Sequence, residues 1–198
     1  ARYRAQALIA DWLSRFDDWE SFVWRPDIIG SRLANWITHF AFYAADSDAQ
    51  FRAELFASLA RQSRHLSRSS HLARPGLETI AALQGLIYVG VAVPESDNYL
   101  AQGLELLETE TGKQVLPDGG HVSRSPHAQL RMLRTLLEIR DSLVAAHIDL
   151  PNWLEVVIER MVPMTRALRL GDGTLARFHG GSGGVSAEID MILAKSKI

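Results

Sequence analysis

Apolar side chains recur every three or four residues through most of this chain, a spacing typical of helices that bury one face. Leu8, Trp12 and Phe16 share one such face, and Ile29, Leu33 and Phe40 share the next. Proline and aspartate residues mark the breaks between these segments. The pattern predicts helices that end near Asp17, begin at Pro26, follow Asp48, span 77–93, follow Pro94, and cover 126–147, 151–168 and 185–194.

The segment from Ile80 to Val93 is apolar on almost all sides, and by composition it could form a buried strand. Residues 77–84 lead into it without a turn signal, so we expect a buried helix. Gly85 and Gly90 inside this helix are expected to let neighbouring helices approach closely. The predicted fold class is therefore all-α, one domain of antiparallel helical hairpins.

Composition excludes several kinds of chemistry. Lys and Arg together number 21 against 23 Asp and Glu, and this balance does not favour nucleic acid as a partner. The chain has no cysteine, no histidine spacing typical of a metal site, and no apolar run long enough to span a membrane. We therefore expect no metal, no cofactor, no nucleic-acid partner and no membrane span.

The densest group of chemically versatile side chains lies in the stretch 116–127, between two predicted helices. It contains Asp118, His121, Arg124 and His127. Histidine can act as a general base near neutral pH, and arginine can neutralise a carboxylate. The stretch also contains Pro-Asp-Gly, a good turn sequence, and Ser-Pro, a good helix start, so a purely structural turn is the alternative.

A second group, Arg32, Asn35 and Trp36, falls within about one helical turn. A tryptophan face can stack on a sugar ring, while arginine and asparagine can hydrogen-bond hydroxyl and carboxylate groups. The alternative is structural, with Trp36 in the core and Arg32 paired with an acidic residue. A basic stripe is interpreted as a solvated helix face, and it comprises Arg61, Arg64, His65, Arg68 and Arg74.

Several stretches resemble the helical domain of heparinase II/III-family proteins of a bacterial branch. They are Trp24–Asp27, Arg32–Trp36, Arg61-Gln62, His65-Leu66, Leu83–Tyr88, Gln114–Pro126, Arg160–Met164 and Gly171–Gly173. In that family an incomplete (α/α) toroid precedes a β-sandwich domain. The resemblance implies a toroid over residues 1–170, then a Gly-rich linker and a short terminal segment over 171–198, leading toward a β domain that the chain lacks.

Characterised relatives in this family are lyases that cleave uronic-acid polysaccharides by β-elimination. The resemblance implies that the whole protein is such a lyase, acting on an acidic polysaccharide or oligosaccharide. His121 and His127 would be the acid and base groups. Arg32 and Arg124 would contact carboxylate or sulfate, and the sugar contacts would come from Asn35, Trp36 and Asp118.

The sequence departs from the family's catalytic pattern at two places. Gly76-Leu77-Glu78 stands where the lyases carry Asn-His, and Ser123–His127 lacks their Glu and Tyr. The alternative function is therefore a non-catalytic glycan-binding or envelope-associated protein that lost the lyase residues. A third hypothesis is a helical scaffold for protein partners.

The chain starts at Ala1 without a methionine or a signal-peptide pattern, so we expect it to be part of a longer protein. The resemblance implies a bacterial protein, and the sequence leaves its compartment open between the cytoplasm and the periplasm. By itself it is expected to fold but to be inactive, because the family's cleft is completed by the β domain. Its four tyrosines, Tyr3, Tyr43, Tyr88 and Tyr99, all fall in predicted helices. The face that would meet the β domain is expected to be apolar and to favour a dimer.

Overall fold

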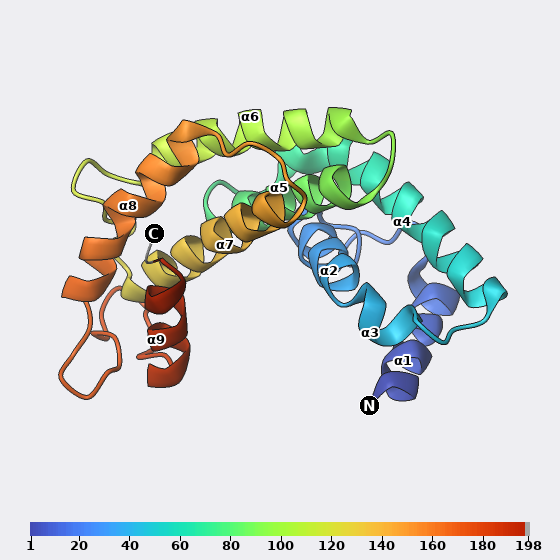
Figure 1. The fold of residues 1–198 in the computed structure, drawn as a ribbon, viewed down its shortest axis with the longest axis horizontal. Coiled ribbons are helices and arrows are strands. Elements are labelled where there is room, and N and C mark those ends of the chain that lie inside the picture. Colours follow the sequence, from blue (N-terminus) through green and yellow to red (C-terminus); the bar gives the residue numbers. More distant parts are fainter. Residues whose placement is uncertain (197–198) are drawn as a thin grey trace. The chain divides into compact units, whose positions relative to one another are not determined.

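The computed structural model describes residues 1–196, and their regular structure is helical (Figure 1). The described residues contain no β-strand, only two isolated antiparallel bridges, Val115 with His121 and Arg169 with Leu175. The elements are α1 (Arg2–Phe16), α2 (Pro26–Thr38), α3 (Phe40–Ala44), α4 (Ala49–Ser69), the 3₁₀ helix η1 (Ser70–Leu72), α5 (Leu77–Ala92), α6 (Asp97–Gln114), α7 (Pro126–Ala145), α8 (Asn152–Ala167) and α9 (Ser186–Lys195).

Periodicity located these helices well, with one correction. The segment that begins at Pro26 does not continue through Phe40, as the spacing predicted. At His39 the backbone leaves helical geometry, with φ −100° and ψ 10°, so α2 ends and Phe40 begins a short helix of its own. The apolar segment after Leu77 is a helix, as expected.

The chain forms two compact units. Unit 1 consists of residues Ala1–Arg74 and Ala81–Gly103, and unit 2 consists of Pro75–Ile80 and the residues from Leu104 onward. Helices α5 and α6 contribute residues to both units.

In unit 1, helices α2 and α5 meet backbone to backbone. A Cβ atom built on Gly85 would lie 2.4 Å from Cα of Gly30, and one built on Gly30 would lie 2.2 Å from the carbonyl oxygen of Ala81. These distances leave no room for a side chain at either position, so the close approach expected from Gly85 is confirmed. The core around this contact contains Ile29, Leu33, Leu55, Leu66 and Leu86.

In unit 2, α7 and α8 form an antiparallel hairpin (Figure 1). Both helices bury an apolar face, which includes Leu133 on α7 and Met161 on α8. Helix α9 packs against α7 through its own buried residues, Ile189 and Ile192. Burial of such aliphatic side chains stabilises the unit by about 1.5–3 kcal/mol for each residue.

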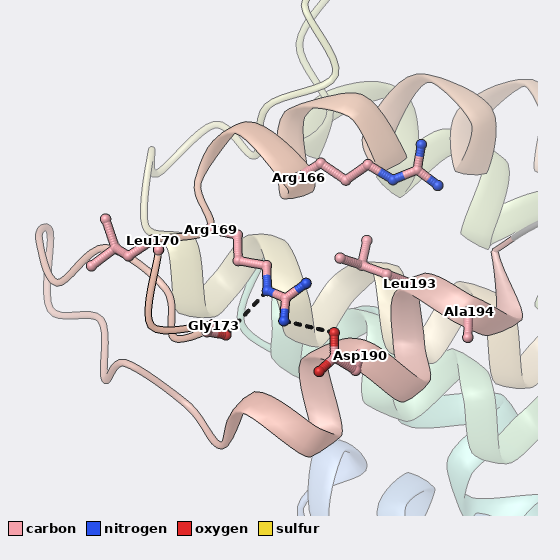
Figure 2. A pocket seen from close by; sticks show the side chains of 8 residues that line it. Arg166, Arg169, Leu170, Gly173, Asp190, Leu193 and Ala194 are labelled. Carbon is pink, nitrogen blue, oxygen red and sulfur yellow. Dashed lines mark hydrogen bonds and ion pairs between the residues drawn. The ribbon is translucent and has the colours of Figure 1, made fainter.

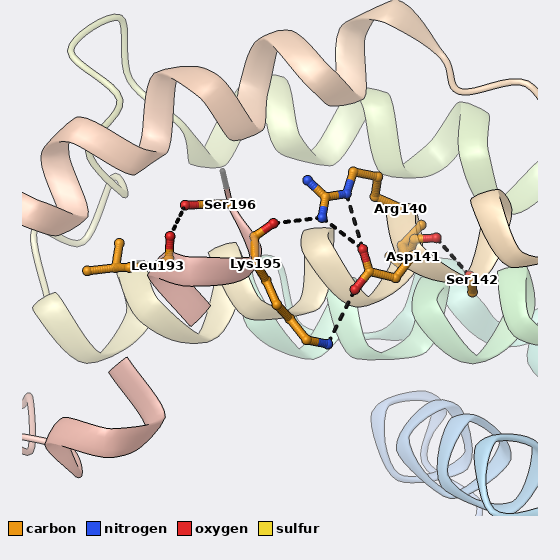
Figure 3. A network of polar contacts seen from close by, with 7 residues as sticks. Arg140, Asp141, Ser142, Leu193, Lys195 and Ser196 are labelled. Carbon is orange, nitrogen blue, oxygen red and sulfur yellow. Dashed lines mark hydrogen bonds and ion pairs between the residues drawn. The ribbon is translucent and has the colours of Figure 1, made fainter. Parts of the chain in front are cut away.

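Polar contacts anchor the end of α9 to α7 (Figure 3). The Nζ atom of Lys195 lies 3.3 Å from Oδ2 of Asp141. Arg140 donates one hydrogen bond to Oδ1 of Asp141 at 2.8 Å and another to the carbonyl oxygen of Lys195 at 2.9 Å. These contacts hold the last helix in place at the edge of two cavities described below.

Candidate functional site

The loop between α6 and α7 is a turn closed by its own backbone. The N–H of Leu116 donates to the carbonyl of Gly120, and the N–H of Gly119 donates to the carbonyl of Leu116, both at 2.9 Å. At Gly119 φ is +79°, and a Cβ atom there would lie 2.0 Å from the carbonyl oxygen of Arg160 on α8. Only glycine fits this position, so the loop is seated tightly on α8.

Gln129 on α7 ties this loop to both helices of the hairpin. Its Oε1 accepts a hydrogen bond from the N–H of His121 at 2.6 Å. Its Nε2 lies within donating distance of the carbonyl oxygens of Gly119, at 3.0 Å, and Met161, at 3.2 Å. Gln129 is 1% exposed. Sequence reasoning missed this residue, although a glutamine among the apolar positions of α7 was a signal that could have identified it.

His121 lies inside the turn, with 5% of its surface exposed. Its Nδ1 accepts from the N–H of Ser123 at 3.1 Å and lies 2.8 Å from the Ser123 hydroxyl. We therefore assign the ring proton to Nε2, which is buried and has no hydrogen-bond partner in the described part of the chain. Burial lowers the pKa of His121, so the ring is neutral at neutral pH.

Asp118 and Arg124 form an ion pair across the same turn, with Oδ2 and Nη1 2.6 Å apart. Oδ1 of Asp118 also accepts from the N–H of Gly120 at 2.9 Å. The hydrogen bond from Arg124 is the main cause that lowers the pKa of Asp118, and the Gly120 bond adds to it. Arg124 is therefore already engaged with a carboxylate of its own loop.

His127 lies in the first turn of α7 and lines a cavity of about 520 Å³, which we call the His127 cavity. Its Nδ1 lies 3.1 Å from the hydroxyl of Ser182. Arg131, one helical turn later, is exposed and has no ion-pair partner among the described residues. The other lining residues are Leu130, Arg134, Gly184, Val185, Glu188 and Ile192.

The residues predicted in the second group belong to unit 1. Arg32 donates from Nε to Gln62 at 2.7 Å and from Nη1 to the carbonyl of Val23 at 3.2 Å, and its guanidinium lies 4.1 Å from the ring centre of Trp12. No carboxylate pairs with it among residues 1–196, so the expected acidic partner is wrong. Burial lowers the pKa of Arg32 to about 10, which leaves it charged at neutral pH.

Asn35 and Trp36, the other two residues of this group, differ in their exposure and contacts. Asn35 is exposed, and its Nδ2 donates to the carbonyl of Ser31 at 2.7 Å. Trp36 is half-buried and meets the Trp12 ring edge-on, with centroids 5.2 Å apart. The sequence-predicted residues thus fall into two groups: Arg32, Asn35 and Trp36 in unit 1, and Asp118, His121, Arg124 and His127 in unit 2.

Two further observations bear on the kinds of site that the described residues form. They contain no group of three or more His, Asp or Glu side chains arranged to hold a metal ion. No helix within residues 1–196 combines the length and the apolar character needed to cross a membrane. Tyr3, Tyr43, Tyr88 and Tyr99 all lie in helices, as predicted.

Comparison with solved structures defines the class of fold. The crystal structure of a heparinase III matches 98% of this chain with a TM-score of 0.80 at 15% identity, and the chain covers 32% of that protein. Heparan sulfate lyase HepC from Pedobacter heparinus matches 89% of the chain with a TM-score of 0.66 at 24% identity, and 32% of HepC is covered. The fold is thus the all-α, incomplete (α/α) toroid of antiparallel hairpins, as predicted.

The family follows from sequence. Residues 9–189 match the family model of the heparinase II/III N-terminus, and the chain therefore belongs to the heparinase II/III family.

Two curated relatives differ in the roles that their names describe. FtsZ-localized protein C from Caulobacter vibrioides is 35% identical over 191 residues, which are 96% of this chain and 33% of that protein. A heparin-sulfate lyase from Pedobacter heparinus is 25% identical over 182 residues, 82% of this chain and 27% of the lyase. The chain spans about a third or less of the length of these relatives.

Proposed function

We propose that the protein binds an acidic glycan through unit 2 and does not cleave it by β-elimination. The observation that carries this proposal is that the side chains of the turn contact one another, whereas those of the neighbouring cavity face open space. Asp118, His121 and Arg124 are engaged in the internal contacts of the turn, whereas His127 and Arg131 line an open cavity.

Elimination requires a base and an acid within reach of the sugar, together with a group that neutralises its carboxylate. His121 is buried and Arg124 is held in an ion pair with Asp118, so each would have to leave a contact of the turn before it could act on a sugar. Gly76, which stands where the resemblance places an Asn-His pair, has φ +104° and donates from its N–H to Glu110 at 2.7 Å. That backbone conformation disfavours any residue with a Cβ atom. These features support the proposal that this protein kept the fold of the family and lost the groups needed for β-elimination.

The His127 cavity has suitable chemistry for an acidic sugar. Arg131 supplies a guanidinium for a carboxylate or sulfate, while His127 and Ser182 supply groups for hydroxyls. Arg134 is compensated by Glu188 at 2.7 Å, so Arg131 carries the uncompensated charge of the lining. The volume of about 520 Å³ lies within the range of roughly 300–1,000 Å³ typical of small-molecule sites.

The decisive experiment offers a panel of uronate polymers to the intact protein. Binding is measured at equilibrium, and cleavage is followed by the ultraviolet absorbance of the unsaturated product. We expect binding without product, and we expect Arg131→Gln to weaken binding while Arg160→Gln, an exposed arginine outside the cavity, does not. Steady product formation that is lost in His127→Ala would contradict the proposal and establish a lyase.

A second candidate function is a role at the site of cell division. It is favoured by 35% identity, over 96% of this chain, with a protein named for its localisation with FtsZ. A fluorescent fusion of the intact protein, imaged in its native host together with labelled FtsZ, tests this role. Coincident bands at the division site would support it, and a uniform distribution in dividing cells would rule it out.

A further inference from the structure

A second cavity lies on the other side of α9, within unit 2 (Figure 2). Its volume is about 780 Å³, and we call it the Arg166–Arg169 cavity. Helix α9 lines both cavities, with Glu188 and Ile192 in the His127 cavity and Asp190 and Leu193 in this one. The lining residues are Arg166, Arg169, Leu170, Gly171, Gly173, Asp190, Leu193 and Ala194.

The two arginines of this cavity are in different electrostatic situations. Arg169 reaches from the end of α8 to α9, where its Nη2 lies 2.7 Å from Oδ1 of Asp190 (Figure 2). Its Nε also donates to the carbonyl oxygen of Gly173 at 3.3 Å. Arg166 is exposed and has no ion-pair or hydrogen-bond partner for its guanidinium within the described part of the chain. The lining therefore has one compensated arginine and one free positive charge.

We propose that the Arg166–Arg169 cavity is an oxyanion site that takes a carboxylate or sulfate group of an acidic sugar. This inference rests on the glycan binding proposed above and adds a second point of contact. A guanidinium presents several N–H donors in one plane, and hydrogen bonds to an anion are about twice as strong as those between neutral groups. The free charge of Arg166 gives the oxyanion its main attraction.

The rest of the lining suits such a ligand. The carbonyl oxygen of Gly173 holds Nε of Arg169 in position before any ligand arrives, which reduces the entropy lost on binding, while Asp190 competes with a ligand for the guanidinium. The side chain of Leu193, which lies between the two arginines in Figure 2, supplies apolar surface for the carbon face of a sugar ring. A Cβ atom built on Gly171 would have no neighbour within 4 Å, so the cavity is open beside this residue.

The test measures binding to the intact protein by calorimetry at constant ionic strength. The probes are sodium sulfate, glucuronic acid, and uronate oligosaccharides with and without sulfate groups. Arg166→Gln is compared with Arg160→Gln, which removes the same charge from the same helix outside both cavities. We expect Arg166→Gln to weaken binding of the oligosaccharides about tenfold, the usual effect of losing one charge-assisted hydrogen bond. Arg160→Gln is expected to change it less than about twofold.

Two further variants test the geometry of the site. Gly171→Glu should abolish binding, because it places a carboxylate beside the opening without a steric clash. Asp190→Asn should tighten binding, because Arg169 then loses its internal anion and becomes free for the ligand. A thermal midpoint for each variant confirms that unit 2 remains folded.

The outcomes separate this proposal from the proposed function. In one outcome, Arg131→Gln weakens oligosaccharide binding while Arg166→Gln and Gly171→Glu leave it intact. This result would overturn the Arg166–Arg169 site and leave the proposed glycan binding in place. Binding of inorganic sulfate without competition by any oligosaccharide would also overturn it. The absence of binding to every acidic glycan would remove both proposals. Preference between the sulfated and unsulfated oligosaccharides identifies which oxyanion the cavity takes.

Discussion

The backbone N–H of His121 donates to the side-chain carbonyl of Gln129 at 2.6 Å, which makes the loop before α7 part of the α7–α8 hairpin. The amide nitrogen of the same glutamine reaches the carbonyl oxygens of Gly119 and Met161. One buried side chain thus satisfies polar groups of the loop and of α8. The turn is closed by its own backbone hydrogen bonds, and Gln129 joins it to both helices of the hairpin.

Replacing Gln129 by leucine is therefore expected to destabilise the protein by about 3 kcal/mol, because buried donors and acceptors lose their partners. Denaturant unfolding measures the change. Gln50 is exposed on α4, and Gln50→Leu serves as the control, with an expected effect within about 0.5 kcal/mol. Equal effects of the two substitutions would show that the loop does not depend on Gln129.

Two glycines of unit 2 are expected to respond to alanine in opposite ways, because one has no room for a Cβ atom and the other does. Gly119→Ala places Cβ 2.0 Å from a carbonyl oxygen at a positive φ, and we expect a loss of more than about 2 kcal/mol. Gly112 lies within α6, and a Cβ there meets nothing within 4 Å. Gly112→Ala should stabilise the protein by about 0.5–1 kcal/mol through its helix propensity. Thermal unfolding of both variants checks the opposite signs.

The stability of the protein should fall when the solution is acidified below the ordinary histidine pKa of 6.5. Burial lowers the pKa of His121 and is also the main cause that lowers the pKa of His65, so the unfolded chain binds protons more readily than the folded one. The contribution of the two neutral histidine rings to the free energy of unfolding is complete above pH 6.5. It is lost as the pH falls from there toward the pKa values of these rings in the folded protein.

Urea midpoints measured between about pH 7.5 and pH 5 test this dependence. The variant His121→Asn should show a shallower loss of stability on acidification than the unsubstituted protein. His127→Asn is the matched control, since His127 is only half-buried and lines a cavity. An unchanged slope in His121→Asn would contradict the role given to burial of this ring.

Arg32 offers a test of a buried cation that has no acidic partner. Arg32→Lys should destabilise unit 1 by about 1–2 kcal/mol, because lysine keeps the charge but loses the planar contacts with Gln62 and Trp12. Arg32→Met should cost less, because it keeps apolar contact with Trp12 and leaves no buried charge. Chemical denaturation ranks the two variants, and a larger loss in Arg32→Met would show that the charge itself stabilises the unit.

Periodicity was sufficient to locate the long helices and the turn, although not the break at His39, because these features depend on local spacing and on residues such as Pro117 and Gly119. It could not show how the loop that contains His121 is held, since the contacts that tie it down come from Gln129 and α8. The two cavities were also beyond prediction. Each brings together side chains separated by more than twenty residues, such as Arg166 and Asp190, and depends on how α9 packs.

The contact between Gly30 and Gly85 has a consequence for how these two positions tolerate change. Each must remain small because the backbone of the other helix lies where its side chain would be. Once α2 and α5 have been pushed apart by an alanine at one position, an alanine at the other meets a gap that is already open. The two substitutions should therefore be strongly epistatic, with a double variant that is more stable than the sum of the single losses indicates. We therefore expect the second glycine to be free to vary in lineages that have lost the first.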